Sequence, residues 1–168
     1  RKEGRLLKSV EGQPLSWLDP TIPANVELEL SALKEVVRNY DVDGIHLDYI
    51  RFPPGAAFKG NKAQAINAFV QKAHDALKAI RPDIKLSAAV WGAYPSCVSS
   101  VGQDWALWLK SGWVDFLCPM NYTTDLFEFS TLLRKQMSLP GAKGRIVAGI
   151  GVTAAESGTY TDFCNINV

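Results

Sequence analysis

The stretch VDGIHLDYIRFPPG, residues Val42–Gly55, has the apolar alternation of a buried strand, yet it carries a histidine, an aspartate and an arginine. Burying such groups costs free energy unless they are paired or take part in binding or a reaction. In an extended strand, His46 and Asp48 share one face, and Leu47 and Tyr49 share the other. We therefore expect Leu47 and Tyr49 to face a helix layer, while His46 and Asp48 point to the opposite side.

The chain around this stretch alternates between the hydrophobic periods of helices and strands. Strands are predicted at Gly44–Ile50, Ile84–Trp91, Trp113–Tyr122 and Gly144–Val152, with an earlier strand ending near Leu15–Pro20. Helices are predicted from a Thr21 cap and Pro23 onward, over Lys62–Ile80, over Gln103–Ser111 and over Asp125–Met137. This order is that of repeated βαβ units, which implies parallel strands with helices outside them.

Two α/β architectures fit this order: an open doubly wound sheet and a (β/α) barrel. An open nucleotide-binding sheet usually has a glycine-rich first turn, and GIG at Gly149–Gly151 is too short and too late to be one. A complete barrel normally takes about 250 residues, which is more than the 168 residues present. A barrel formed by this chain would therefore be incomplete.

The composition is that of a globular protein, because 47% of the 168 residues are hydrophobic and the formal net charge is +1. We expect one domain over residues 1–168. The near-neutral charge gives no electrostatic case for binding nucleic acid. No apolar run approaches the roughly 20 residues of a membrane-spanning helix. The three cysteines form no CxxC pair, so neither a zinc site nor a thioredoxin-like motif is indicated.

Asp48 is the first candidate for chemistry. In a barrel it would lie near the C-terminal mouth of its strand, where barrel enzymes place their catalytic groups. The alternative is a structural carboxylate that pairs with Arg51 or His46 and orders the following loop. His46 could hydrogen-bond this carboxylate or a ligand, or it could be a satisfied core histidine. No further histidine–carboxylate cluster supports a metal pair of His46 and Asp48, so we expect no metal and no cofactor.

The fourteen residues Tyr40–Pro53, YDVDGIHLDYIRFP, closely resemble the signature of the glycosyl hydrolase-like 10 family. Two further stretches support the resemblance, WLDPTIPANVELELSALKEVV from Trp17 and SVGQDWALWLKSGWVDFLCPMNYT from Ser100. The family comprises glycosidases that are largely bacterial and commonly exported. The resemblance therefore implies a carbohydrate substrate and a location in the cell envelope, the periplasm or outside the cell.

The same resemblance covers roughly residues 17–151 and implies a (β/α)8 TIM barrel in which Gly44–Ile50 is strand four. The chain would then hold about strands three or four to seven, and the N-terminal strands of the barrel would be missing. Those early strands carry part of the active-site wall in a complete barrel.

Two better-known barrel families suggest roles by resemblance. GIHLD is similar to the strand-four segment of α-amylase-like enzymes, which puts Asp48 at the position of their nucleophile. Chitinase-like enzymes carry D-G-x-D-x-D-x-E there, so Asp43 and Asp48 match, while His46 and Ile50 replace an aspartate and the acid glutamate. Chitinase-type machinery is therefore not indicated. PMNY, ending at Tyr122, is similar to their strand-six segment, whose tyrosine faces the sugar.

Glycoside hydrolysis usually needs two carboxyl groups, and the second one is not evident in the sequence. Asp104 is the possible second carboxylate, although at the start of a helix it could simply be a capping residue. Asp115 begins a strand at the end opposite a barrel mouth and is expected to be structural. The acid could otherwise lie in the segment that the resemblance places before this chain.

Aromatic and polar side chains near the predicted strand ends would hold a sugar. Trp91 would stack on the apolar face of a sugar ring. The side chains of His46, Arg51, Asn121 and Tyr122 would contact the sugar's polar groups.

We therefore hypothesise a glycoside hydrolase with Asp48 as nucleophile or stabilising carboxylate. The first alternative is a non-catalytic carbohydrate-binding barrel, which needs only one carboxylate. The second is a metal-dependent hydrolase, which needs a histidine–carboxylate cluster around His46 and Asp48.

Overall fold

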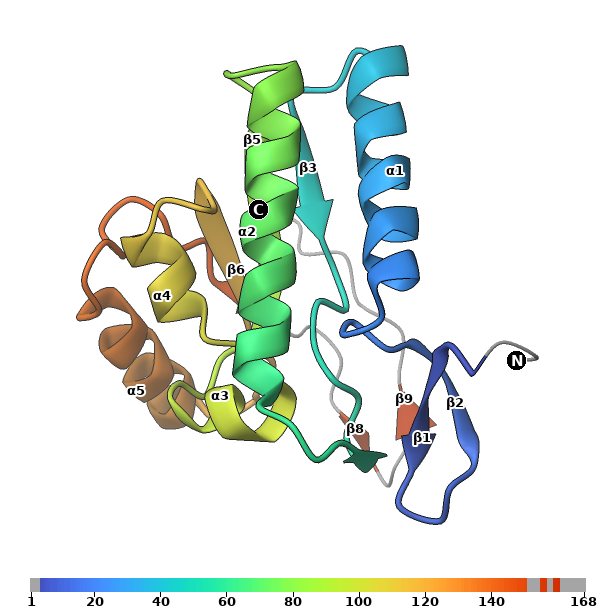
Figure 1. Cartoon of the computed structure of the whole chain (residues 1–168). Coiled ribbons are helices and arrows are strands. Elements are labelled where there is room, and N and C mark those ends of the chain that lie inside the picture. Colours follow the sequence, from blue (N-terminus) through green and yellow to red (C-terminus); the bar gives the residue numbers. More distant parts are fainter. Residues whose placement is uncertain (1–3, 151–154, 157–158, 161–168) are drawn as a thin grey trace.

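The structure, a computed structural model, describes residues 4–150, 155–156 and 159–160 (Figure 1). Its main sheet has four parallel strands in the order β3-β5-β6-β7. They are β3 (Gly44–Leu47), β5 (Lys85–Trp91), β6 (Phe116–Asn121) and β7 (Gly149–Ile150). The spatial order follows the chain order without reversal, so right-handed crossovers put their helices on one face, as in a barrel. The predicted incomplete (β/α) barrel is confirmed: the sheet curls as half of one.

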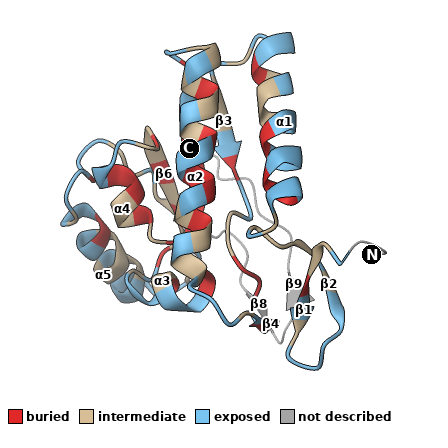
Figure 2. Cartoon of the chain, in the orientation of Figure 1, coloured by how far each residue is buried: buried red, intermediate tan, exposed pale blue. Residues whose placement is uncertain are grey.

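Five helices accompany the sheet: α1 (Pro23–Asn39), α2 (Lys62–Ile80), α3 (Ser96–Val101), α4 (Trp105–Lys110) and α5 (Leu126–Met137). In Figure 1, α2 lies in front of β5, and β3 is seen between α2 and α1. The predicted helix Lys62–Ile80 is confirmed at both ends, and the side chain of Asn61 caps it by accepting the N–H of Gln64 at 3.0 Å. Its buried stripe has helical spacing and comprises Ile66, Phe69, Val70, Ala73 and Leu77 (Figure 2).

The central strand β5 is buried from Leu86 to Val90 because β3 and β6 flank it and helices cover its outer face. The strand register aligns His46 with Ser87 and Trp91 with Met120, so these four side chains share the inner face of the half-barrel. The outer face, which packs under the helices, is apolar and includes Leu47, Leu86, Ala88, Val90 and Leu117.

A second, antiparallel sheet has the order β2-β1-β4 and comprises β1 (Leu6–Ser9), β2 (Pro14–Leu18) and β4 (Ala56–Ala57). The strand expected near Leu15–Pro20 therefore exists, but it pairs with β1 and not with the parallel sheet. Consequently β3 is an edge strand in the described part of the chain. A short hairpin of β8 (Ala155–Glu156) and β9 (Thr159–Tyr160) follows.

Three local predictions are corrected by the structure. Helix α1 has Ile22 as its N-cap without a side-chain bond, because Thr21 donates both its N–H and its hydroxyl to Asp19. Strand β3 ends at Leu47 because Tyr49 has a left-handed backbone, with φ of 54°. The side chain of Tyr49 is consequently 62% exposed and does not face the helices.

The remaining boundaries differ from the predictions by a few residues. Helix α3 was not predicted and lies just before the predicted helix Gln103–Ser111, which is observed as α4. Strand β6 begins later than expected, at Phe116. Strand β7 is reduced to two residues plus a bridge between Leu117 and Ile146, and the predicted end at Val152 lies outside the described residues.

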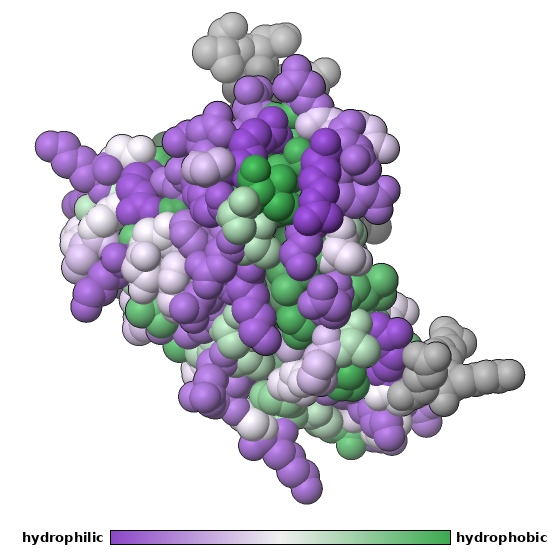
Figure 3. Space-filling model, turned by 45° about the horizontal axis from the view of Figure 1, so that its top comes forward, coloured by the Kyte–Doolittle hydropathy of each residue, from purple (hydrophilic) through white to green (hydrophobic). Residues whose placement is uncertain are grey.

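On the face shown in Figure 3, hydrophilic areas alternate with smaller apolar areas. Its exposed large apolar side chains include Leu126 and Phe127 at the start of α5. Within the described residues, none of the helices has the length and hydropathy needed to cross a membrane.

Candidate active site

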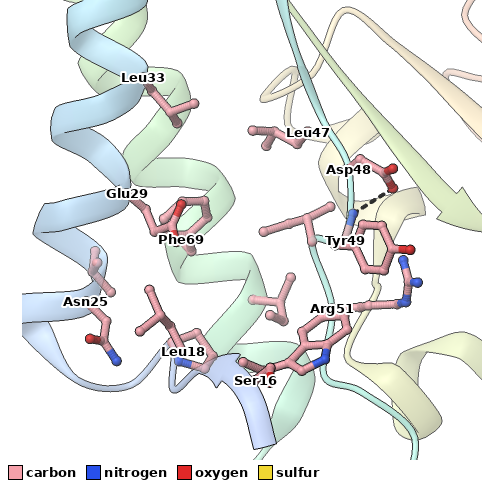
Figure 4. A pocket seen from close by; sticks show the side chains of 15 residues that line it. Ser16, Leu18, Asn25, Glu29, Leu33, Leu47, Asp48, Tyr49, Arg51 and Phe69 are labelled. Atoms are coloured by element: carbon pink, nitrogen blue, oxygen red, sulfur yellow. Dashed lines mark hydrogen bonds between the residues drawn. The ribbon is translucent and has the colours of Figure 1, made fainter. Parts of the chain in front are cut away.

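A cavity of about 620 Å³ opens at the C-terminal end of β3 (Figure 4). Side chains from β2, α1, α2 and the loop after β3 line it. The wall formed by the two helices is mostly apolar, and the loop after β3 contributes Asp48, Tyr49 and Arg51. We call this cavity the Asp48 pocket. It lies between the end of β3 and helices α1 and α2, on the helix side of the sheet, and it reaches the loop that follows β3.

Asp48 follows the last residue of β3 directly, and its carboxylate is exposed. One carboxylate oxygen, Oδ1, accepts the backbone N–H of Tyr49 at 2.7 Å. Within the described residues the carboxylate forms no salt bridge with Arg51 or His46. The described residues therefore do not show the structural alternative, in which Asp48 pairs with one of these residues and orders the loop.

His46 lies one inner-face position before Asp48 on β3. Its ring atom Nδ1 is 2.8 Å from the hydroxyl oxygen of Ser87 on the neighbouring strand β5. This contact orients the imidazole, and the residue is nevertheless exposed, because β3 is the edge of the half-barrel. His46 is thus held on the same face as Asp48 without being bonded to it.

Arg51 lies among three aromatic rings. Its guanidinium carbon is 4.5 Å from the ring centre of Tyr49, 5.7 Å from that of Trp17 and 6.0 Å from that of Trp91. The rings of Trp17 and Tyr49 also contact one another, with their centres 5.5 Å apart. Arg51 and Trp91, which the sequence assigned to one site, are therefore brought together, and Asp48 lines the same pocket as Arg51.

Trp17 and Glu29 are pocket residues that the sequence reasoning did not assign. Trp17 belongs to the antiparallel strand β2, whose approach to the loop after β3 is a long-range contact without a local sequence signal. Glu29 lies on α1, where a single glutamate normally belongs to the solvated face of the helix. In Figure 4, Glu29 extends from α1 beside Phe69, whereas Asp48 lies across the cavity at the end of β3 with its carboxylate pointing away from the two helices.

Asn121 lies away from the Asp48 pocket. It is 1% exposed on the outer face of β6, where its amide bonds with that of Gln136 on α5 at 2.7 and 3.0 Å. Gln136 also donates to the carbonyl oxygen of Gly92, at 2.9 Å. This buried amide pair joins α5 to the sheet and holds the side chain of Asn121 on the helix side, away from the inner face. Tyr122, the next residue, is 57% exposed at the end of β6, two strands away from β3.

Asp104 also lies outside the Asp48 pocket. It is the N-cap of α4, and its Oδ1 accepts the N–H of Leu107 at 3.4 Å and the hydroxyl of Tyr94 at 3.2 Å. It lines a different cavity, between α2 and α3. Burial and the neighbouring Asp104 charge raise the pKa of Tyr94 above its ordinary value. The capping role that the sequence allowed for Asp104 is thus present.

Asp115 lies just before β6, at the opposite end of the parallel sheet, and it is extensively paired. Its carboxylate accepts the N–H of Leu86 at 2.9 Å and contacts the ammonium groups of Lys85 at 3.2 Å and Lys78 at 3.6 Å. Burial alone would raise the pKa of Asp115, but the Leu86 bond and the two lysine charges outweigh it and hold the pKa below its ordinary value. The predicted structural role of Asp115 agrees with these contacts.

The residues that the structure describes contain no group of three or more histidine, cysteine, aspartate and glutamate side chains placed to hold a metal ion. Within that part of the chain, no ligand cluster around His46 and Asp48 supports the alternative of a metal-dependent hydrolase.

Comparison with known proteins finds a matching family and similar solved structures. Residues 1–141 match the model of the DUF4015 family, which is described as "Putative glycosyl hydrolase domain". The fold is similar to the crystal structure of the chitinase domain of the spore coat protein CotE from Clostridium difficile, with a TM-score of 0.58 and 17% sequence identity. That similarity covers 88% of this chain and 51% of the chitinase domain, so this chain spans about half of that length. No curated protein matches the chain.

Proposed function

Because the chain belongs to the DUF4015 family, we propose that it acts as a glycoside hydrolase on the O-glycosidic bonds of an oligo- or polysaccharide. The family supports a glycosidase-like role rather than membership of the glycosyl hydrolase-like 10 family in particular. The observation that carries the proposal is the exposed Asp48 carboxylate, which has no charged partner in the described residues and lines a cavity with aromatic rings.

Asp48 acts in this proposal as nucleophile or as stabilising carboxylate. Glycoside cleavage passes through a transition state with positive charge on the sugar ring, and a fixed carboxylate beside the ring stabilises that charge. The N–H of Tyr49 holds one oxygen of Asp48 in place, and the other oxygen has no hydrogen bond within the described residues. A carboxylate paired with arginine or lysine would be a weaker nucleophile and would neutralise less of the developing charge.

Neighbouring side chains would position the sugar. Trp17 and Trp91 offer aromatic surface for its C–H groups, and His46 and Arg51 offer polar contacts on the Asp48 side of the inner face. Tyr122 could reach only a longer substrate, because two strand spacings separate its strand from β3, roughly 10 Å. Asn121 has no place in this arrangement, since its amide is committed to Gln136.

Glu29 is our candidate for the second carboxylate, because it lines the same pocket as Asp48. Asp104 is not retained in this role, since it lines another cavity and caps α4. The similarity to the chitinase domain is one of fold, and His46 and Ile50 occupy positions where chitinase-like enzymes carry acidic residues. We therefore do not propose chitin as the substrate.

We further propose that the protein is exported, because its strand-four signature resembles that of a glycosidase family whose members are commonly exported.

Release of reducing sugar from a panel of bacterial and plant polysaccharides tests this function. We expect release by the wild-type chain, its loss in Asp48→Asn and a marked reduction in Glu29→Gln. Asp83→Asn is the matched control, because Asp83 is exposed beside the opposite, N-terminal end of β5. Full activity of Asp48→Asn would refute the assignment of Asp48.

The second candidate function is carbohydrate binding without hydrolysis. It is favoured by one observation, that Asp104 is used as a helix cap rather than as an acid facing Asp48. A polysaccharide that the wild-type chain and Asp48→Asn bind equally, and that neither of them cleaves, would establish this alternative.

A further inference from the structure

The guanidinium of Arg51 is the charged group of the Asp48 pocket whose hydrogen-bonding capacity the protein itself leaves unused. Its Nε and Nη1 atoms are buried, and neither has a hydrogen-bond partner. Buried donor groups in native proteins are nearly always satisfied, and a charged donor left unpaired is more costly than a neutral one. These two atoms therefore indicate a missing acceptor.

The surrounding rings cannot supply that acceptor. The rings of Trp17, Tyr49 and Trp91 attract the positive charge, with Tyr49 nearest at 4.5 Å. The N–H groups of a guanidinium, however, lie in its plane and require lone pairs at its edges. The aromatic cluster holds Arg51 in position and leaves its hydrogen-bonding capacity unused.

Asp48 does not fill the role either, although it lies only three positions before Arg51. One of its oxygens accepts the N–H of Tyr49, and the described residues contain no ion pair between Asp48 and Arg51. Arg51 is also the only cationic residue among the described residues that line the Asp48 pocket, which otherwise carries the acidic Asp48 and Glu29. An anion from outside the chain would therefore bind at Arg51 rather than elsewhere in the pocket.

We propose that Arg51 binds an anionic substituent of the sugar, a carboxylate or a phosphate ester, so that the substrate is an acidic glycan. The third nitrogen, Nη2, is not among the buried unpaired atoms, and it belongs to both N–H edges of the guanidinium. An oxyanion that reaches Nη2 can use its second oxygen for Nε or Nη1, which is the paired geometry that arginine favours with carboxylate and phosphate groups. The proposal rests on the proposed function and specifies its substrate class.

The direct test compares charged and uncharged forms of one sugar. Calorimetry with Asp48→Asn, which keeps the substrate intact, would measure binding of linear uronic-acid trisaccharides and of their methyl esters. The two forms share the same sugar backbone and differ at the carboxyl groups, which are charged in the acid and neutral, with an added methyl group, in the ester. We expect the acids to bind at least about tenfold more tightly than the esters, with a preference that shrinks as salt is added. A phosphate-bearing oligosaccharide of similar length shows which oxyanion Arg51 prefers.

Variants at position 51 test whether the preference for the acid over the ester depends on Arg51. Arg51→Gln should remove it, and Arg51→Lys should restore part of it, because lysine keeps the charge but lacks the paired N–H edge. Arg38→Gln is the control, since Arg38 is exposed in the last turn of α1 and does not line the pocket. The acid–ester comparison on the unaltered Arg51 needs no variant at this position, so it stays decisive if Arg51→Gln fails to fold.

Equal binding of acid and ester, an acid preference that survives Arg51→Gln, or no binding of any charged probe would overturn the inference. These outcomes are distinguishable from failure of the proposed function. Hydrolysis of a neutral polysaccharide that depends on Asp48 but not on Arg51 would retain the glycosidase and reject the acidic substrate. Arg51-dependent binding of acids with no cleavage of any acidic glycan would retain the anion site and reject the hydrolase.

Discussion

The two ends of the parallel sheet use their charged residues in opposite ways. At the N-terminal end, the carboxylate of Asp115 is bound by a backbone N–H and two lysines, and Arg145 donates to the carbonyl oxygens of Leu109, Val114 and Asp115. At the C-terminal end, Asp48 has one backbone bond, and Arg51 has two buried N–H-bearing atoms without partners. Paired charges hold loops together, whereas unpaired charges beside a cavity are available to a ligand.

The largest stability difference is expected between the two arginines. Arg145→Met removes the bonds to three carbonyl oxygens and should lower the free energy of unfolding by about 3 kcal/mol. Arg51→Met keeps a side chain that can pack on the rings and removes two unpaired donors, so its effect should stay within about 1 kcal/mol. Urea denaturation of both variants measures this contrast, and equal losses would remove the distinction between the two ends.

The buried amide pair of Asn121 and Gln136 should give the next largest effect. Asn121→Ala leaves the amide of Gln136 without its partner beside the sheet, so we expect a loss of about 2 kcal/mol in the free energy of unfolding. A double-mutant cycle with Gln136→Ala should be strongly non-additive. Independent, additive losses would show that the two amides do not act as a pair.

The two aspartates should differ in the same direction by a smaller amount. Asp115→Ala leaves the Leu86 N–H without its acceptor and removes the salt bridge to Lys78, which should cost about 1.5 kcal/mol. Asp48→Ala should change the free energy of unfolding by no more than about 0.5 kcal/mol, because the carboxylate is exposed and forms no salt bridge. A larger loss for Asp48→Ala than for Asp115→Ala would reverse the roles assigned here.

The smallest effect expected is a pH dependence of the free energy of unfolding, and it arises from Asp115. Its pKa in the folded protein is lower than the ordinary value of 3.8, so its contribution to stability is present above that value and is lost as the pH falls through the folded pKa. Wild type should therefore lose its advantage over Asp115→Asn below about pH 4. Thermal unfolding between pH 2 and pH 7, at the same salt concentration, checks this; a constant difference would contradict it.

The sequence predicts the architecture well because its elements have local signatures. The stripe and cap of α2 and the continuous apolar run of β5 can be read directly from residue spacing. The small sheet of β1, β2 and β4 depends on pairing between distant segments, which no local sequence pattern predicts. The end of β3 depends on the left-handed backbone of Tyr49, a conformation that residue type predicts mainly for glycine.

The candidate site is predicted less completely, and the reason is geometric. Asn121 and Tyr122 are consecutive, so an extended strand cannot direct both side chains to the same face. In the structure, the side chain of Asn121 lies on the helix side of the sheet, where it forms a hydrogen bond with Gln136. Asp104 has a cap position and a possible catalytic position that the sequence cannot separate, and its bond to the Leu107 N–H shows that the cap is formed. Trp17 enters the pocket from another sheet.

The most direct test of the central claim is the rate of polysaccharide hydrolysis by Asp48→Asn relative to wild type, measured on samples with the same urea midpoint. We expect kcat/KM to fall at least about a hundredfold, while the Asp83→Asn control keeps the wild-type rate. A wild-type rate in the folded Asp48→Asn variant would contradict the claim that the unpaired carboxylate at the end of β3 is the centre of the site.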